Sequence, residues 1–192
     1  MNYREDKQEH LKNRKRFETK KDAILERRVI DYLLIHTDLQ AVKLDMNSID
    51  FAILPKGAKY DPYKQGSDVD HRKVVAYVEV KGSKMKECLT KGSTESTLRH
   101  SDNVWLSVKK LNQIQYYELV KKKPCYVAYP YGCGEVSFIR YYDIEGYVSF
   151  KGRPPREGST HDTEMIVSIA KWRFTVYDPE TPNFLQDLCT SQ

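Results

Sequence analysis

The sequence contains no apolar run long enough to cross a membrane, which requires roughly 18 or more consecutive apolar residues. Its opening stretch, MNYREDKQEHLKNRKRFETKK, also lacks the apolar segment of a signal peptide. Both absences argue against a membrane-bound or secreted protein. We therefore expect a cytoplasmic protein that has no membrane partner.

Cysteine is scarce and irregularly placed. The four cysteines, Cys88, Cys125, Cys133 and Cys189, show neither the C-x-x-C spacing nor the histidine partners of a zinc site. We expect reduced thiols, with an iron–sulfur cluster held by the four scattered cysteines as the weaker alternative. Cys125 lies in the strand-like run CYVAY, where the expected role is that of a small buried side chain.

The signature motifs of several large enzyme classes are missing as well. No G-x-S-x-G, P-loop, H-E-x-x-H or dinucleotide-binding fingerprint occurs. The chain therefore gives no local support for a serine hydrolase, an NTPase, a zinc protease or an oxidoreductase, and we expect no nucleotide cofactor. Internal repeats and low-complexity tracts are also missing, so a single compact domain is the simplest expectation.

The chain is basic and of one-domain size. Its 192 residues carry a net charge of +5, with a pI near 8.9, a bias that favours polyanionic partners. Residues 4–28 hold ten Lys or Arg against six Asp or Glu. We expect residues 1–20 to form a flexible basic arm and residues 21–192 a single domain. Candidate phosphate contacts in and next to the arm are Lys12, Arg14, Lys15, Arg16, Lys20 and Lys21.

Hydrophobic periodicity predicts a mixed α/β domain. Apolar residues at helical spacing predict an amphipathic helix over 22–36. Alternation of Ile49, Phe51 and Ile53 with more polar residues predicts a strand, and VVAYVEVKG predicts its antiparallel partner after a long connection. The runs VWLSV and CYVAYPYG and several segments after residue 134 predict further strands. KKLNQIQYYELVKKK predicts a second helix with a basic last turn.

One charged pair lies inside a strand that otherwise has a buried composition. Glu79 and Lys81 are two residues apart among Tyr77, Val78 and Val80, and the period of a strand places both charged side chains on one face. The simplest interpretation is a solvent-facing surface with an ordinary ion pair. Burial would instead require a compensating charge, because an unpaired buried ion is strongly destabilising.

Asp50 favours the second interpretation. It lies on the preceding predicted strand between Ile49 and Phe51, and a hairpin can set it beside Glu79. Two adjacent carboxylates repel each other unless a cation lies between them. Mg²⁺ binds one or two carboxylates together with water and phosphate oxygens, so this pair predicts a divalent metal site.

The segments SIDFAIL and YVEVKG resemble the PD-(D/E)xK nuclease superfamily. Asp50 matches the first acid of the family motif, Glu79 the second and Lys81 the lysine, while an isoleucine replaces the proline. The long interval between the acids leaves Asp68 and Asp70 as alternatives for the first. The resemblance implies a restriction-endonuclease-like fold, in which helices flank a mixed central β-sheet.

Features of the two predicted helices extend the resemblance. Glu26 matches the glutamate that many members place on a helix before the core, and Gln113 with Tyr117 resembles the Q-x-x-x-Y helix of RecB-type members. Lys109 and Lys110, near the start of that second helix, are candidate phosphate contacts. The C-terminal part is similar to that of small nuclease-like proteins of phages and plasmids. Two alternatives stay open: Glu26 could lie at the margin of an exposed helix face, and Gln113 could be an ordinary helix glutamine.

The resemblance implies a Mg²⁺- or Mn²⁺-dependent deoxyribonuclease in a bacterial or phage-infected cell. Asp50, Glu79, the Val80 carbonyl and Glu26 would hold the metal, which lowers the pKa of a bound water and neutralises charge on the phosphate. Lys81 would orient that water or stabilise the transition state electrostatically, and the helix glutamine would help to place the water or the phosphate.

Other interpretations stay open at this point. The chain could be a catalytically inactive nucleic-acid-binding protein of the same fold, or a structural or interaction domain in which the charged pair lies on the surface. A homodimer is also open, because an enzyme that cuts both strands of DNA needs a site for each. The sequence does not distinguish DNA from RNA.

The basic arm, residues 1–20, predicts salt-sensitive binding to nucleic acid. Each lysine or arginine that contacts a phosphate releases a counterion, so the dissociation constant should rise steeply with salt. Fluorescence anisotropy with a short DNA duplex, measured from low to high salt, checks this. A dissociation constant that stays flat across the series would favour an arm that only keeps the protein in solution.

Overall fold

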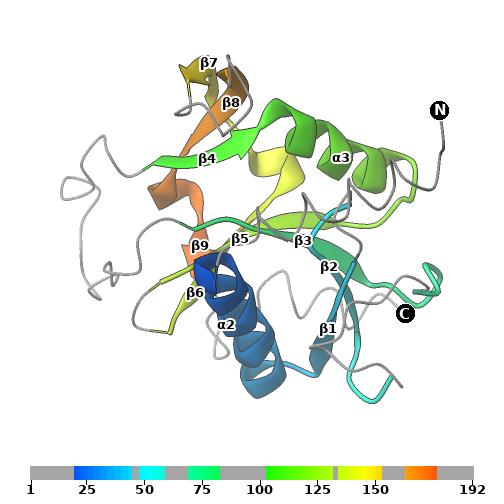
Figure 1. Cartoon of the computed structure of the whole chain (residues 1–192). Helices are drawn as coiled ribbons and strands as arrows, with labels where there is room; N and C mark the ends of the chain where they lie inside the picture. The colour runs from blue at the N-terminus through cyan, green and yellow to red at the C-terminus, as the bar shows by residue number, and fades with distance from the viewer. Residues whose placement is uncertain are drawn as a thin grey trace, which may run out of the picture.

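The computed structural model describes residues 20–44, 48–58, 69–82, 103–131, 134–152 and 163–176 (Figure 1). These residues form a mixed α/β fold, as the sequence predicts, with two β-sheets and two helices longer than one turn. Arg16 and the rest of the basic arm up to residue 19 lie outside the described residues, as do the side chains of Lys20 and Lys21. Neither of these two helices has the length and apolar character that crossing a membrane requires.

Helix α2, Lys20–His36, covers one face of the larger sheet (Figure 1). Leu25, Val29 and Leu33 recur at helical spacing and are buried, which confirms the predicted amphipathic helix. They belong to one apolar cluster with Phe51 and Val78 of the sheet. Burial of this stripe fixes α2 against the strands that carry the charged pair.

The larger sheet is mixed but mostly antiparallel. Its strands lie in the order β1-β2-β3-β5-β6-β9, and β3 and β5 are its one parallel pair among the described residues. Phe51 of β2 lies opposite Val78 of β3, which is the antiparallel pair that the sequence predicts. The strands are β1 Leu39–Lys43, β2 Phe51–Pro55, β3 Ala76–Val80, β5 Cys125–Pro130, β6 Val136–Arg140 and β9 Thr175–Val176.

Strand β2 is buried on both faces, so the predicted alternation of a buried and a polar face is wrong. Phe51 and Ile53 belong to the cluster under α2, whereas Ala52 and Leu54 belong to a second apolar cluster on the opposite side of the sheet. Helix α3 and the smaller sheet cover that side (Figure 1). The polar residues of the predicted strand lie before its first residue, at the edge of these layers.

The smaller sheet is antiparallel, in the order β4-β8-β7, and packs over the second cluster. Val104 and Leu106 pair with Ile169 and Val167, and all four side chains are buried in the cluster that also contains Tyr77. The sequence predicts strands in these segments but not their separation from the larger sheet. The strands are β4 Asn103–Ser107, β7 Tyr147–Gly152 and β8 Thr163–Ala170, and two 3-10 helices are η2 Tyr141–Asp143 and η3 Lys171–Arg173.

Strand β1 has no counterpart in the predicted order of elements. Its first four residues are all buried, and Ala41 lies opposite Ile53 of β2. The run LQAVK is too short for its periodicity to distinguish a strand from the loop that follows a helix. Pairing with β2 and packing under α2 determine this strand, rather than a strong local preference.

Helix α3, Val108–Leu119, ends earlier than predicted. Ser107 caps its N-terminus, where the Ser107 Oγ accepts a hydrogen bond from the Lys110 N–H. Val120 is the C-cap, and Lys122 has a φ of 53°, in the left-handed region, where the chain turns toward β5. The predicted basic last turn is therefore wrong, because the three lysines before Pro124 follow the helix.

A buried carboxylate ties α3 to β5. The Cys125 N–H donates a hydrogen bond to Glu118 Oε2 at 2.5 Å, and Arg140 lies 3.4 Å from the other oxygen. Cys125 is a buried free thiol, as the sequence predicts, and burial raises the pKa of this thiol. Three cysteines lie outside the described residues: Cys88, Cys133 and Cys189.

Ile114 is a fully buried anchor of α3. Ile114→Ala should lower the free energy of unfolding by about 2–5 kcal/mol, because the shorter side chain leaves a cavity between α3 and the sheet. Urea denaturation followed by circular dichroism measures this change. Asn112→Ala, on the exposed side of the same helix, should change it by less than about 0.5 kcal/mol. Equal midpoints for the two variants would contradict this placement of α3.

Candidate active site

A charged cluster lies where β2 begins and β3 ends. The two strands are antiparallel, with Phe51 opposite Val78, so Asp50, directly before β2, comes next to Glu79 of β3. Strand β3 is buried on both faces and parallel to β5. The pairing of the strands thus brings two acids that are distant in the chain to one end of the sheet.

Asp50 continues the pairing of β2 with β3 through its side chain. Its Oδ2 accepts a hydrogen bond from the Val80 N–H at 2.8 Å. The next residue, Lys81, donates its N–H to Ala128 of β5. The backbone groups of successive strand residues point alternately to the two neighbouring strands. Since the Lys81 N–H points to β5, the N–H and carbonyl of Val80 point to β2. The Val80 carbonyl, a predicted metal ligand, therefore leaves the strand on the side of the Asp50 carboxylate.

Glu79 is a fully buried carboxylate, with 0 % of its side chain exposed. Lys81 forms an ion pair with Oε1, and the Lys110 ammonium lies 3.0 Å from Oε2. Glu79 and Lys81 therefore do not form an ordinary surface ion pair. Two cations compensate the free energy that burial of a lone carboxylate would cost.

Lys110, from the first turn of α3, joins the two carboxylates. Its Nζ lies 3.0 Å from Glu79 Oε2 and 3.8 Å from Asp50 Oδ1, and it donates a hydrogen bond to the Ser48 carbonyl at 2.7 Å. The two carboxylate oxygens therefore cannot be farther apart than the sum of the first two distances. Both lysines near the start of α3 are predicted phosphate contacts. Lys110 lies in the cluster, whereas Lys109 is exposed.

Burial and mutual charge shift the pKa values of this cluster. Burial, and then the Glu79 carboxylate, raise the pKa of Asp50 to about 7, against the effects of Lys81, Lys110 and the Val80 N–H. Burial also acts to raise the pKa of Glu79, but the two lysines outweigh it and hold this pKa below its ordinary value. Burial acts to lower the pKa of Lys81, yet the two carboxylates raise it above its ordinary value. Glu79 and Lys81 are thus charged at neutral pH.

Helix α2 contributes two further acids, Glu26 and Asp22, from the face of the sheet that this helix covers. Glu26, a predicted metal ligand, is turned inward and forms an ion pair with Lys43 of β1. Asp22 lies one turn earlier on the helix. Burial acts to lower the pKa of Lys81, whereas the negative charges of Glu79, Asp50 and, with the smallest effect of the three, Asp22 raise it. Asp22 is not among the site residues predicted from the sequence. Its position four residues before Glu26, on the same side of the helix, is the signal that could have identified it.

One face of α3 points toward the segment before β2. The Tyr117 hydroxyl hydrogen-bonds with Ser48 Oγ, and Lys110 bonds the carbonyl of the same serine. Gln113 is half-buried and lies between them at helical spacing. The Tyr117 ring packs on Tyr77, with ring centroids 4.4 Å apart, so its hydroxyl rather than its ring faces the cluster. Its contact with nucleic acid stays a prediction.

Of the two rival acids, Asp70 has a different charged partner. Asp70 forms an ion pair with Arg72 at 3.1 Å, and hydrogen bonds from the Arg72 side chain and N–H lower the pKa of Asp70. Asp68 lies outside the described residues. Asp50 is therefore the acid that the described structure places next to Glu79.

The oxygen donors of the cluster fit a hard divalent ion. The Asp50 and Glu79 carboxylates and the Val80 carbonyl are oxygen ligands, and Mg²⁺ binds one or two carboxylates while it keeps several waters. Within the described ranges, no three His, Cys, Asp or Glu side chains converge on one point. The described residues therefore do not form a closed zinc site with three or four protein ligands.

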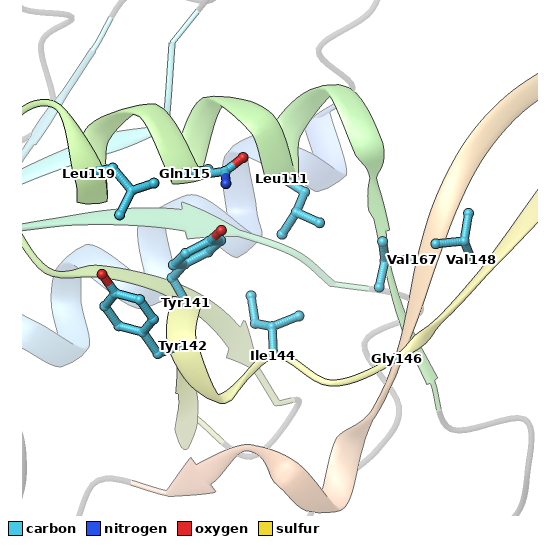
Figure 2. A pocket seen from close by; sticks show the side chains of 9 residues that line it. All are labelled: Leu111, Gln115, Leu119, Tyr141, Tyr142, Ile144, Gly146, Val148 and Val167. Atoms are coloured by element: carbon cyan, nitrogen blue, oxygen red, sulfur yellow. The ribbon is translucent and has the colours of Figure 1, made fainter.

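A groove of about 490 Å³ lies on the far side of α3, between this helix, η2 and the smaller sheet. Figure 2 shows Leu111 and Leu119 of α3 facing Tyr141 and Ile144 across it. Among the residues that line this groove there is no carboxylate, histidine or cysteine. The charged cluster, rather than this groove, therefore holds the carboxylates that can bind a metal ion.

The raised pKa of Asp50 predicts a pH-dependent stability of the metal-free protein. Between its ordinary pKa of 3.8 and about 7, the folded protein keeps a proton on Asp50 that the unfolded chain has lost. This group therefore lowers the free energy of unfolding as pH rises through that range. Asp50→Asn removes the penalty, so the stability of the variant relative to the wild type should increase by about 1–4 kcal/mol from pH 4 to pH 8.

Urea denaturation of both proteins with EDTA, across this pH range, measures the difference. Asparagine keeps an oxygen that can accept the Val80 N–H, so the comparison isolates the charge at position 50. Parallel stability curves for the two proteins would contradict a raised pKa for Asp50.

Comparison with models of known protein families gives no match. No curated protein and no solved structure matches the chain either. The functional assignment therefore depends on the geometry and the charges of the cluster itself.

Proposed function

We propose that this protein is a metal-dependent nuclease that hydrolyses phosphodiester bonds of DNA, with a site of the PD-(D/E)xK type. One observation carries the proposal: Asp50 and Glu79 converge on a single cation position, with Lys81 beside them, at the end of a buried strand. Two carboxylates can hold a divalent metal that activates water for phosphodiester hydrolysis, and a neighbouring lysine can stabilise the charge that develops on the phosphate.

The order of the elements supports a restriction-endonuclease-like fold. Helix α2 is followed by the antiparallel strands β1, β2 and β3, then by β4 of the smaller sheet, by α3 and by β5, which is parallel to β3. This order resembles the core of the superfamily, with the first acid at β2, the second acid and the lysine at the end of β3, and the glutamine on the following helix.

In the proposed mechanism the chain supplies the ligands and the positioning groups. Asp50, Glu79 and the Val80 carbonyl would hold Mg²⁺ or Mn²⁺, which supplies Lewis-acid activation of water and charge neutralisation at the phosphate. In the metal-free protein burial acts to lower the pKa of Lys81, but the Glu79 and Asp50 carboxylates raise it above its ordinary value, so this side chain is an ammonium at neutral pH. As an ammonium it would donate hydrogen bonds to the attacking water or to a phosphate oxygen. Gln113, at helical spacing between Lys110 and Tyr117, would be a further donor.

Charge supports a nucleic acid as the substrate. The net charge of +5 and the basic arm favour a polyanion. DNA rather than RNA follows from the resemblance alone, and so does a homodimer with one site for each strand.

The second candidate is a nucleic-acid-binding protein of the same fold that has lost catalysis. One observation favours it: Lys81 and Lys110 already compensate the buried Glu79 carboxylate, so this acid keeps its charge without a metal. Such a protein would bind DNA but would not cleave it.

Lys81→Ala should retain Mn²⁺ binding but reduce DNA cleavage by at least about a hundredfold, because it removes a transition-state donor and no metal ligand. Asp50→Ala should lose both properties. Cleavage of supercoiled, linear and single-stranded DNA with Mg²⁺ or Mn²⁺, together with Mn²⁺ titration calorimetry, measures these effects.

The Glu79→Gln protein is the isosteric control for loss of a ligand charge, and it should be inactive. Undiminished cleavage by Lys81→Ala would refute the assignment of the lysine. Binding of DNA by the wild type without cleavage of any substrate in the panel would instead support the second candidate.

A further inference from the structure

We propose that Lys110 occupies the divalent-metal position in the metal-free protein, and that a metal ion binds by displacing its ammonium. The inference rests on the proposed function, since it assumes that Asp50 and Glu79 form a metal site. It adds a residue that the family motif does not contain, and it assigns that residue to metal loading.

The oxygen atoms around the Lys110 ammonium are of the kinds that Mg²⁺ prefers. They are one oxygen of each carboxylate and the Ser48 carbonyl, at 3.0, 3.8 and 2.7 Å. These distances suit an ammonium, whereas Mg²⁺ binds its ligands at about 2.0–2.1 Å. A metal ion that used both carboxylates would have to take the space of the ammonium, because one cation position lies between them.

Lys110 places its ammonium within 4 Å of an oxygen of each carboxylate. Glu79 has Lys81 as a second cation on its other oxygen, and Asp50 Oδ2 has the Val80 N–H. The oxygens that face each other are the ones that Lys110 contacts. Displacement of Lys110 by a divalent ion would therefore leave both acids neutralised and the other contacts intact.

The displaced ammonium has a route out of the site. Lys110 lies in the first turn of α3, and 23 % of its side chain is exposed. Its backbone is held by the Ser107 cap and by the burial of Ile114 one turn later. The side chain can therefore swing toward solvent while the helix stays in place.

Removal of the Lys110 charge should strengthen metal binding. Mn²⁺ titrated into the full-length Lys110→Met protein should bind about tenfold to a hundredfold more tightly than in the wild type, because no ammonium has to be displaced. Lys56→Met is the matched control, since it removes the same charge from an exposed lysine just after the far end of β2. Its Mn²⁺ affinity should equal that of the wild type.

Loss of fold is checked separately from metal affinity. Thermal melting with EDTA tests whether Lys110→Met is folded, and Lys110→Gln provides a second neutral variant that can still donate to the Ser48 carbonyl. In the wild type, diamagnetic Mg²⁺ should shift the lysine Cε resonance that is missing from the Lys110→Gln spectrum. This spectral measurement requires no activity.

The outcomes separate the inference from the proposed function. Tighter Mn²⁺ binding by the Lys110 variants, with no change in Lys56→Met, supports both. Equal or weaker Mn²⁺ binding by a folded Lys110 variant, with clear binding by the wild type, overturns the displacement and leaves the metal site standing. No Mn²⁺ binding by the wild type or by either Lys110 variant refutes the metal-dependent function and the inference with it.

Discussion

Burial of the Glu79 carboxylate is the constraint on which the rest of the site depends. A carboxylate without exposed surface is strongly destabilising unless cations or hydrogen-bond donors reach its oxygens. Lys81 supplies one cation from the position directly after the same strand, and Lys110 supplies the other from α3. The attraction that satisfies the buried charge therefore also holds the first turn of α3 over the end of β3, so the same contacts maintain the fold and assemble the candidate site.

Helix α3 is the element that connects the layers. Ile114 anchors it in the apolar cluster, and Glu118 bonds the start of β5. Its face toward β2 carries Lys110 and Tyr117, which meet at Ser48, while another face lines the apolar groove. A change in the position of this helix would alter the cation arrangement and the groove together.

Local rules explain why part of this structure is predictable from the sequence. The stripe from Leu25 to Leu33 is long and strongly periodic, so α2 follows from it, and the two-residue period places Glu79 and Lys81 on one face. The sequence does not predict strand β1, and it predicts a polar face on β2 that the structure does not have. Both differences arise because the burial of these strands depends on helices and strands that are distant in the chain. The contacts of Lys110 are missed for the same reason, since they depend on where α3 packs.

The hydrogen bond from the Val80 N–H to Asp50 extends the sheet by one side-chain link. The Asp50 carboxylate accepts this hydrogen bond in place of a backbone carbonyl, directly before the first residue of β2. An asparagine at position 50 would provide the same acceptor, because its side-chain oxygen can replace the carboxylate oxygen. The link between the two strands therefore depends on an acceptor at position 50 and not on its charge, so natural variants with asparagine at this position would keep the architecture.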